Sequence, residues 1–514
     1  MLVKTYGSAV YGVNAQTITV EVNAGEGAGY FLIGLPDNAV KESQWRIETA
    51  FKNAGLKLPR KKVVINMAPA DIRKEGSAYD LTIAAAMLAV SDQVTEIEKL
   101  GKYLIMGELS LDGSLKPIKG ALPIAIQARK EGFEGFILPV QNAREAAIVA
   151  DFKVYGANHL GEVVSFFNGD EGAIERFEVD TRREFAEQQA NVEFDFADVK
   201  GQENIKRALE IAAAGGHNVI MIGPPGSGKT MLAKRLPSIL PPLTLHEALE
   251  TTKIHSVAGK LAQNVGLTPI RPFRSPHHTI SDVALVGGGA VPQPGEISLA
   301  HNGVLFLDEL PEFKRTVLEV MRQPLEERRV TISRAKFSVD YPASFMLVAA
   351  MNPCPCGYYN HPDKDCVCAP GVVQKYLSKV SGPLLDRIDI HIEVTPVSFD
   401  QLSEQRKAEN SLEVRERVLK ARDIQTERFK GNPAVYSNAM MSSSKVQEIC
   451  QISAVGQKLL KTAMERLQLS ARAYDRILKV SRTIADLAAS EEIRPEHLAE
   501  AIQFRSLDRE NWAG

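Results

Sequence analysis

The stretch GPPGSGKT, residues 223–230, follows the apolar run VIMI (219–222) and precedes the helix-like sequence MLAKRL (231–236). It fits the pattern G-x-x-x-x-G-K-[ST] in the strand, loop and helix context that this pattern needs. Glycine lets the backbone N–H groups of such a loop turn toward an anion, and the N-terminus of the next helix adds partial positive charge. The sequence therefore predicts a phosphate-binding loop in an α/β domain.

The ligands expected at this loop are ATP and Mg²⁺. Lys229 would reach the β- and γ-phosphates, and the hydroxyl of Thr230 would ligate the metal ion. A glycine-rich turn without a ligand is the alternative, and the agreement of loop, lysine, threonine and flanking elements argues against it. The residues expected to bind the nucleotide are Gly223, Pro224, Pro225, Gly226, Ser227, Gly228, Lys229 and Thr230.

A second element of an ATPase follows downstream in VLFLDE, residues 304–309. An apolar strand that ends in two acids is what the hydrolytic half of such a site needs. Asp308 would hold Mg²⁺, and Glu309 would polarise the attacking water. Alone, such a strand can simply be a strand end; its place after the phosphate loop favours the catalytic interpretation.

Three further polar residues are candidates for the same reaction. Asn352 ends the strand-like run FMLVAAMN (345–352) and would orient the water, although it could also start the turn-rich NPCPCG. Arg387 would stabilise phosphoryl charge on the ATP of a neighbouring subunit, which implies a ring; the alternative is a local salt bridge with a flanking aspartate. Arg472 would be a second sensor in a helical lid, or else a solvated helix arginine.

The order of these motifs resembles AAA+ ATPases, in the branch that holds magnesium-chelatase motor subunits and MCM helicases. More specific are the stretches 271–289 (RPFRSPHHTISDVALVGGG) and 292–310 (PQPGEISLAHNGVLFLDEL). Together with GLPDNAVKES (34–43) and NMAPADIRKEGSAYDL (66–81), they resemble the YifB/ComM family of magnesium-chelatase-like proteins. That resemblance covers nearly the whole chain. It implies a hexameric DNA branch-migration helicase, with DNA and further copies of the chain as partners.

The N-terminal part resembles the Lon protease C-terminal domain, whose chemistry needs a Ser/Lys dyad. In register, the serine position falls on Ala78 and the lysine position on Leu122, and neither side chain can do the work of a nucleophile or its base. Ser77 and Lys119 are nearby but lie out of register. Proteolysis is therefore not expected, and a retained scaffold for assembly or partner contact is favoured.

These motifs divide the chain into three regions. Residues 1–172 form the expected Lon-protease-like α+β domain, and the charged segment 173–195 is the expected linker. The AAA+ P-loop α/β core is placed at 196–398, and a mostly helical lid at 399–514.

Four of the five cysteines cluster just after Asn352 in a C-x-C…C-x-C pattern. Thiolates in pairs suit tetrahedral Zn²⁺, although C-x-C is a weaker signal than C-x-x-C. A reduced loop without metal and a redox-sensitive pair are the alternatives. The candidate ligands of a structural zinc ion are Cys354, Cys356, Cys366 and Cys368.

DNA contacts are expected at a hairpin between the acidic strand and the Asn352 strand. Within 327–342, Arg334 and Lys336 would grip phosphates in a salt-dependent, sequence-independent manner. A solvated charged hairpin tip is the equal alternative. His277 and His278 are not expected to bind a metal, because neighbouring residues of a strand face opposite ways.

The bulk composition is that of an ordinary globular protein, with 44% hydrophobic and 24% charged residues and a formal net charge of -2. No apolar stretch approaches a membrane span and no signal-peptide core is evident, so a cytoplasmic location without membrane contact is the default expectation. Two alternatives to a DNA motor stay open. One is a chelatase-type motor acting on a protein partner, and the other is an ATP-dependent switch or scaffold without DNA.

Overall fold

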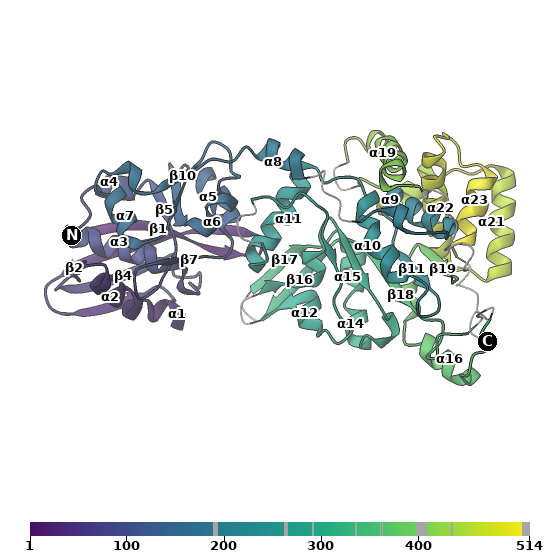
Figure 1. Cartoon of the computed structure of the whole chain (residues 1–514), viewed down its shortest axis with the longest axis horizontal. Helices are drawn as coiled ribbons and strands as arrows, with labels where there is room; N and C mark the ends of the chain where they lie inside the picture. Colours follow the sequence, from purple (N-terminus) through teal and green to yellow (C-terminus); the bar gives the residue numbers. More distant parts are fainter. Residues whose placement is uncertain are drawn as a thin grey trace.

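The structure is a computed structural model of the 514-residue chain. It describes residues 1–188, 194–261, 266–289, 292–334, 337–359, 361, 363–396, 409–432 and 435–505. Figure 1 shows three regions along the long axis: an N-terminal α/β region, a central α/β region and a C-terminal helical region. The mixed α/β class that the sequence predicts is confirmed.

The N-terminal region is built on a sheet with the strand order β10-β9-β8-β5-β1-β2-β4-β3 among the described residues. Helix α3 is buried along its whole length, as its uninterrupted apolar sequence requires. The chain leaves the sheet at Gly107, so the run 102–113 is not one strand. The Gly107 N–H donates to the Ala78 carbonyl, and the Gly107 carbonyl accepts from the Leu81 N–H in the first turn of α3. The strands are β1 (Leu2–Tyr11), β2 (Asn14–Gly25), β3 (Gly29–Ile33), β4 (Lys62–Ala68), β5 (Tyr103–Ile105), β6 (Glu108–Leu109), β7 (Leu115–Lys116), β8 (Gly135–Pro139), β9 (Lys153–Ala157) and β10 (Glu175–Phe177). The helices are α1 (Asn38–Lys41), α2 (Ser43–Asn53), α3 (Asp80–Val90), α4 (Ile97–Leu100), α5 (Ala121–Lys130), α6 (Val140–Ala146) and α7 (Leu160–Phe166).

The segment 173–195 that the sequence suggests as a linker begins as part of this sheet. Strand β10 pairs antiparallel with β9 and adds an edge strand. Helix α8 (Thr181–Gln188) follows, and residues 189–193 lie outside the described part of the chain.

The central region holds a parallel sheet with the order β12-β15-β18-β11-β19. Its inner strands are fully buried apolar runs, because helices cover both faces of such a sheet. The carboxyl ends of parallel strands meet at one edge, which is where ligands bind in this architecture. The strands are β11 (Val219–Ile222), β12 (Phe273–Arg274), β13 (Gly287–Gly288), β14 (Gln293–Pro294), β15 (Val304–Leu307), β16 (Arg329–Arg334), β17 (Phe337–Pro342), β18 (Met346–Met351) and β19 (Ile390–Glu393). The helices are α9 (Glu203–Gly215), α10 (Lys229–Ile239), α11 (Leu245–Ala258), α12 (Asp282–Val286), α13 (Glu296–Leu299), α14 (Arg315–Glu319), α15 (Arg322–Glu327), α16 (Pro370–Leu377) and α17 (Gly382–Leu385).

The C-terminal region is helical, as the sequence predicts, and packs on the central sheet through α22. Buried residues of α22 share one hydrophobic core with α9 and β11. A buried ion pair adds to this packing, with Arg476 lying 2.8 Å from the Asp389 carboxylate at the start of β19. The helices are α19 (Ser411–Arg428), α20 (Ser443–Ile449), α21 (Ala454–Leu467), α22 (Ala471–Leu487) and α23 (Pro495–Gln503). Within the described residues, no helix combines the length and the apolarity needed to cross a bilayer.

Helix α11 joins the N-terminal and central regions. It packs against α5, and Leu243 and Ala248 belong to the N-terminal core. At its carboxyl end, Ser256 accepts a backbone hydrogen bond from Gly120 (3.2 Å), and its hydroxyl donates to the buried Glu145 carboxyl. The two regions are thus connected by both apolar packing and buried hydrogen bonds.

Candidate active site

The phosphate loop connects β11 to α10 at the carboxyl edge of the central sheet. Gly226 and Gly228 have φ values of 77° and 88°, a backbone conformation that side chains oppose. Lys229 is buried, and its Nζ donates to the carbonyl oxygens of Gly223 (2.7 Å) and Pro224 (2.9 Å). Burial lowers the pKa of the Lys229 ammonium, and the negative charge of Asp308 opposes that shift. The loop is therefore shaped by its glycines and crossed by one buried cation.

The predicted metal ligands meet at the same edge. Thr230 Oγ1 donates to Asp308 Oδ2 at 2.7 Å, so the first turn of α10 lies beside the end of β15. Asn352 follows the neighbouring strand β18, and its Oδ1 accepts from Lys229 Nζ at 3.2 Å. A hydroxyl and a carboxylate oxygen are the hard ligands that suit Mg²⁺, so these residues fit that ion.

Glu309 lies next to this cluster, in the left-handed region (φ 53°) and with an exposed side chain. His278 Nδ1 lies 3.2 Å from Glu309 Oε2. The sequence did not predict this contact, because His277 and His278 were expected on opposite faces of a strand. That expectation is wrong. The strand β12 ends at Arg274, and the two imidazole rings lie in the following loop with centroids 4.1 Å apart.

The two candidate arginines lie in a different cavity of about 220 Å³. The Arg387 guanidinium is bonded to the Glu326 carboxylate and to the carbonyl of Pro383. Arg472 NH1 lies 3.3 Å from Asp386 Oδ2. None of the phosphate-loop residues 223–230 lines this cavity. Its lining residues are Glu326, Asp386, Arg387, Met441, Ser442, Ser443, Arg472, Asp475, Arg476 and Lys479.

The four clustered cysteines converge in the loop after β18. Their sulfur atoms all lie within 4.8 Å of one another, and each thiol is free. Cys354 is buried and Cys356, Cys366 and Cys368 are half-buried. Within the described residues this is the group of ligand atoms that could hold a metal ion.

The Lon-like positions lie in and around a cavity of about 390 Å³ between the N-terminal and central regions, because Val257, Pro292 and Gln293 also line it. Ala78 lines this cavity, whereas Leu122 is buried in the core at the start of α5. Ser77 and Lys119 also line it, but the Ser77 hydroxyl donates to the Glu108 carboxylate. The side chain of Lys119 packs against Gly259, just beyond α11. These four positions make no Ser/Lys contact among the described interactions.

The expected DNA hairpin is present as the antiparallel pair β16 and β17. Arg334 ends β16, and Lys336 is outside the described residues. The hairpin prediction is confirmed, while the proposed grip on phosphate stays a prediction.

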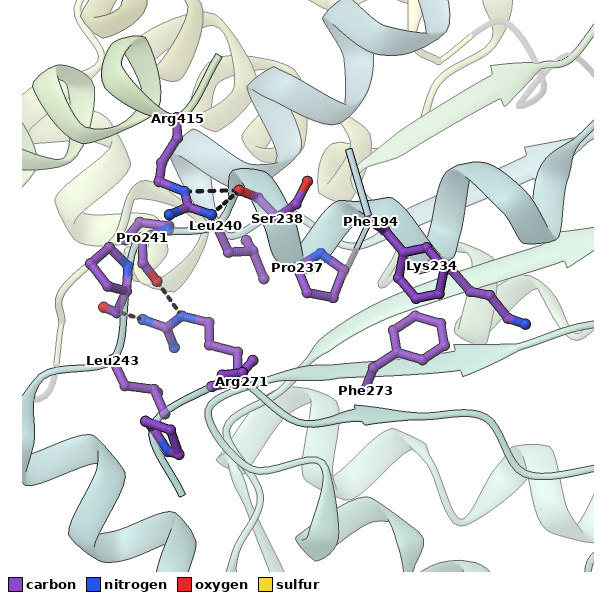
Figure 2. Close-up of a pocket in the computed structure, with 13 residues that line it drawn as sticks. Phe194, Lys234, Pro237, Ser238, Leu240, Pro241, Leu243, Arg271, Phe273 and Arg415 are labelled. Carbon is purple, nitrogen blue, oxygen red and sulfur yellow. Dashed lines mark hydrogen bonds between the residues drawn. The ribbon is translucent and has the colours of Figure 1, made fainter. Parts of the chain in front are cut away.

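A larger cavity of about 430 Å³ lies at the far end of α10 from the phosphate loop. Figure 2 shows that two guanidinium groups of this cavity bind backbone carbonyls: Arg415 donates to the carbonyl of Ser238, and Arg271 donates to the carbonyl of Pro241. Apolar walls such as Phe273 complete it. None of the phosphate-loop residues 223–230 lines this cavity, so it is separate from the candidate nucleotide site.

The parallel sheet, the phosphate loop, the acidic strand end and the helical lid define the AAA+ class of P-loop ATPase architecture. Three family models match the chain: "Magnesium chelatase, subunit ChlI" over residues 195–402, "Subunit ChlI of Mg-chelatase" over 18–142, and "Magnesium chelatase, subunit ChlI C-terminal" over 408–505.

Individual relatives cover nearly the full length. The chain is 45% identical to competence protein ComM of Haemophilus influenzae over 506 residues. These residues cover 98% of this chain and 97% of ComM. It is 44% identical to YifB of Escherichia coli, over 98% of this chain and 96% of YifB. A 157-residue stretch, 28% of this chain, is 33% identical to 27% of Lon protease 2 of Bacillus subtilis. The chain belongs to the YifB/ComM family of magnesium-chelatase-like AAA+ proteins.

Proposed function

We propose that this protein is an ATP hydrolase that assembles into a homo-oligomeric ring and couples hydrolysis to movement along DNA, or to its remodelling, in the cytoplasm.

 The supporting observation is that Lys229, Thr230, Asp308 and Asn352 come together at the carboxyl edge of the sheet. The family to which the chain belongs supports the same assignment, since the model "Magnesium chelatase, subunit ChlI" matches residues 195–402, which contain all four of these residues.

In the proposed reaction, Lys229 binds the phosphates of ATP, and Thr230 and Asp308 would hold Mg²⁺. When bound, that ion would neutralise charge on the phosphate oxygens. Asn352 orients the attacking water beside the γ-phosphate, and Glu309 takes its proton. His278 lies 3.2 Å from Glu309 and would fix the orientation of this carboxylate.

Arg387 is proposed to act on the ATP of a neighbouring copy. It lies with Arg472 in a cavity that none of the phosphate-loop residues 223–230 lines, an arrangement consistent with action on the phosphates of another copy. This role is the basis for a ring, and the hexameric number comes from the resemblance to ComM-type proteins. Arg472, at the start of α22, is proposed to act as the second nucleotide-sensing residue, the one in the helical lid.

DNA is the proposed track of this motor. The relative from Haemophilus influenzae is named a competence protein, and ComM-type proteins resemble this chain over nearly its full length. The hairpin β16 and β17 supplies the proposed contact through Arg334 and Lys336. Because these contacts would be to phosphates, binding should not depend on base sequence and should weaken with salt.

The deciding experiment is steady-state ATP hydrolysis by the full chain with a four-way junction, a fork, single-stranded DNA or no DNA. We expect DNA to stimulate hydrolysis, and the stimulation to fade between low and high salt. Lys229→Ala is the matched blank, because it removes the phosphate-binding cation and should abolish turnover with every substrate. Hydrolysis that stays flat across all nucleic acids would overturn the DNA assignment and favour a motor acting on a protein partner.

A further inference from the structure

The cysteine loop has the geometry of a metal site. Cys366 Sγ lies 3.7 Å from Cys354 Sγ and 3.6 Å from Cys356 Sγ, and Cys354 and Cys356 are 3.3 Å apart. A zinc ion bonded to four thiolates at about 2.3 Å in a tetrahedron places its sulfur atoms about 3.8 Å apart. A disulfide would instead need about 2.0 Å. The spacing therefore matches shared coordination rather than bonded pairs.

The loop has little else to hold its shape. Its described residues between Cys354 and Cys368 contain neither helix nor strand, and most of them are half-buried or exposed. Val367, between two of the cysteines, is 85% exposed. A segment without an apolar core needs a cross-link to bring its side chains together over this distance in sequence. A metal ion bound by the four converging thiols would provide that cross-link.

The same loop touches the phosphate loop at two points. Asn352 Oδ1 accepts from Lys229 Nζ at 3.2 Å, two residues before the first cysteine. Gly357 has a φ of 85° and packs so closely on the phosphate loop that a Cβ atom there would lie 2.5 Å from Pro225 Cδ. Order in the cysteine loop is thus transmitted directly to the residues that would hold the phosphates.

We propose that Cys354, Cys356, Cys366 and Cys368 bind one structural Zn²⁺ that clamps Asn352 and Gly357 onto the phosphate loop. Four thiolates fill the coordination sphere and leave no position for water, so the ion supports the site without taking part in the chemistry. The clamp rests on the proposed ATPase function, whereas the binding of zinc stands independently of it.

The first test measures metal content, which does not depend on activity. The purified full chain should carry one zinc ion per chain, and cobalt substituted for zinc should give the absorption bands of tetrahedral cobalt thiolate. Cys366→Ser/Cys368→Ser should lose both signals. Cys450→Ala is the matched control, because this buried cysteine lies in the helical region outside the cluster, and it should keep them. Wild-type protein that binds neither metal would overturn the proposal.

The second test separates the clamp from the metal. Gly357→Ala leaves all four thiols in place but adds a Cβ atom that must push against Pro225. We expect it to retain zinc and to lower kcat by about tenfold to a hundredfold, since small displacements in an active site have effects of that size. It also serves if the double cysteine variant fails to fold. Normal turnover of zinc-loaded Gly357→Ala would overturn the clamp. Absence of turnover in zinc-loaded wild-type protein would count against the ATPase function alone.

Discussion

Two sites in this chain differ in how their polar side chains are arranged: the phosphate loop of the central region and the cavity of about 390 Å³ at the N-terminal region. At the phosphate loop, Lys229 and Thr230 contact Asn352 and Asp308, so four polar groups from three elements converge. In the N-terminal cavity, the position that a Lon-type serine would take is Ala78. The nearby Ser77 donates to a carboxylate.

The difference shows that a fold and its chemistry are maintained separately. The N-terminal region keeps a fully buried α3 and a cavity of about 390 Å³, as a working enzyme would. It also provides a docking surface, since α11 of the central region packs against α5. Function follows the side chains of a site rather than the fold that carries them.

The largest effect is expected where the phosphate site depends on a second subunit. Arg387→Ala should lower ATP turnover by about 10³-fold or more, because an arginine supplied to the transferring phosphoryl group contributes that much. Mixing these subunits with Lys229→Ala subunits should restore part of the activity, since some interfaces then pair an intact arginine with an intact loop. The measurement is hydrolysis across mixing ratios, with each variant alone as control. No recovery at any ratio would contradict action in trans.

A smaller but still large effect is expected at Glu309. Glu309→Gln keeps the size of the side chain and removes the base, so turnover should fall by about 10²-fold or more while ATP binding is retained. Binding of a fluorescent ATP analogue alongside steady-state hydrolysis would separate the two. His278→Ala is the companion variant, and it should have a weaker effect because it only orients the carboxylate. Near-normal hydrolysis by Glu309→Gln would remove its assigned role.

The positions of the phosphate-loop residues could be predicted from the sequence because their motifs are local. The glycines of 223–230 and the acids that end β15 belong to short segments whose backbone context is fixed by the neighbouring strand and helix. Parallel strands then bring the segments to one edge, so Asn352 could be placed without knowing the full structure. The mixed α/β class followed from the same strand, loop and helix context, and the helical C-terminal region from the order of motifs that resembles AAA+ ATPases.

What the sequence did not indicate depends on contacts between distant segments. Glu145 and Ser256 are 111 residues apart, and nothing near either residue announces their hydrogen bond. The contact between His278 and Glu309 was hidden because a short strand was taken to be longer than it is. Local rules predict which face a side chain takes only while the element continues.

An intermediate effect is expected at the junction, where burial raises the pKa of the Glu145 carboxyl against hydrogen bonds from Ser256, Leu122 and Asn142. A raised folded pKa means that the folded chain binds more protons. The stabilisation is therefore full below the unfolded pKa of about 4.3 and is lost as pH rises through the folded value. Glu145→Gln keeps an acceptor oxygen for Leu122 and Ser256 and cannot ionise.

We expect Glu145→Gln to gain stability relative to wild type as the pH rises from 5 to 8, because only the wild-type carboxyl ionises in that range. Thermal unfolding at the two pH values is the measurement. Ser256→Ala is the control, and it should be less stable than wild type, because it removes the hydroxyl group that donates to the buried Glu145 carboxyl. A wild-type protein whose stability rises between these pH values relative to Glu145→Gln would contradict the assignment.

The smallest effect is expected in the N-terminal cavity itself. Ser77→Ala removes the hydroxyl nearest the Lon-type position, and its only described partner is the Glu108 carboxylate. We expect no change in ATP turnover and no peptidase activity in either wild type or variant, since Ala78 and Leu122 occupy the dyad positions. Hydrolysis of casein and of unstructured peptides, with and without ATP, would measure this. Peptide cleavage by wild type that Ser77→Ala abolishes would mean that the chemistry moved by one residue instead of being lost, and the contrast between the two sites would then disappear.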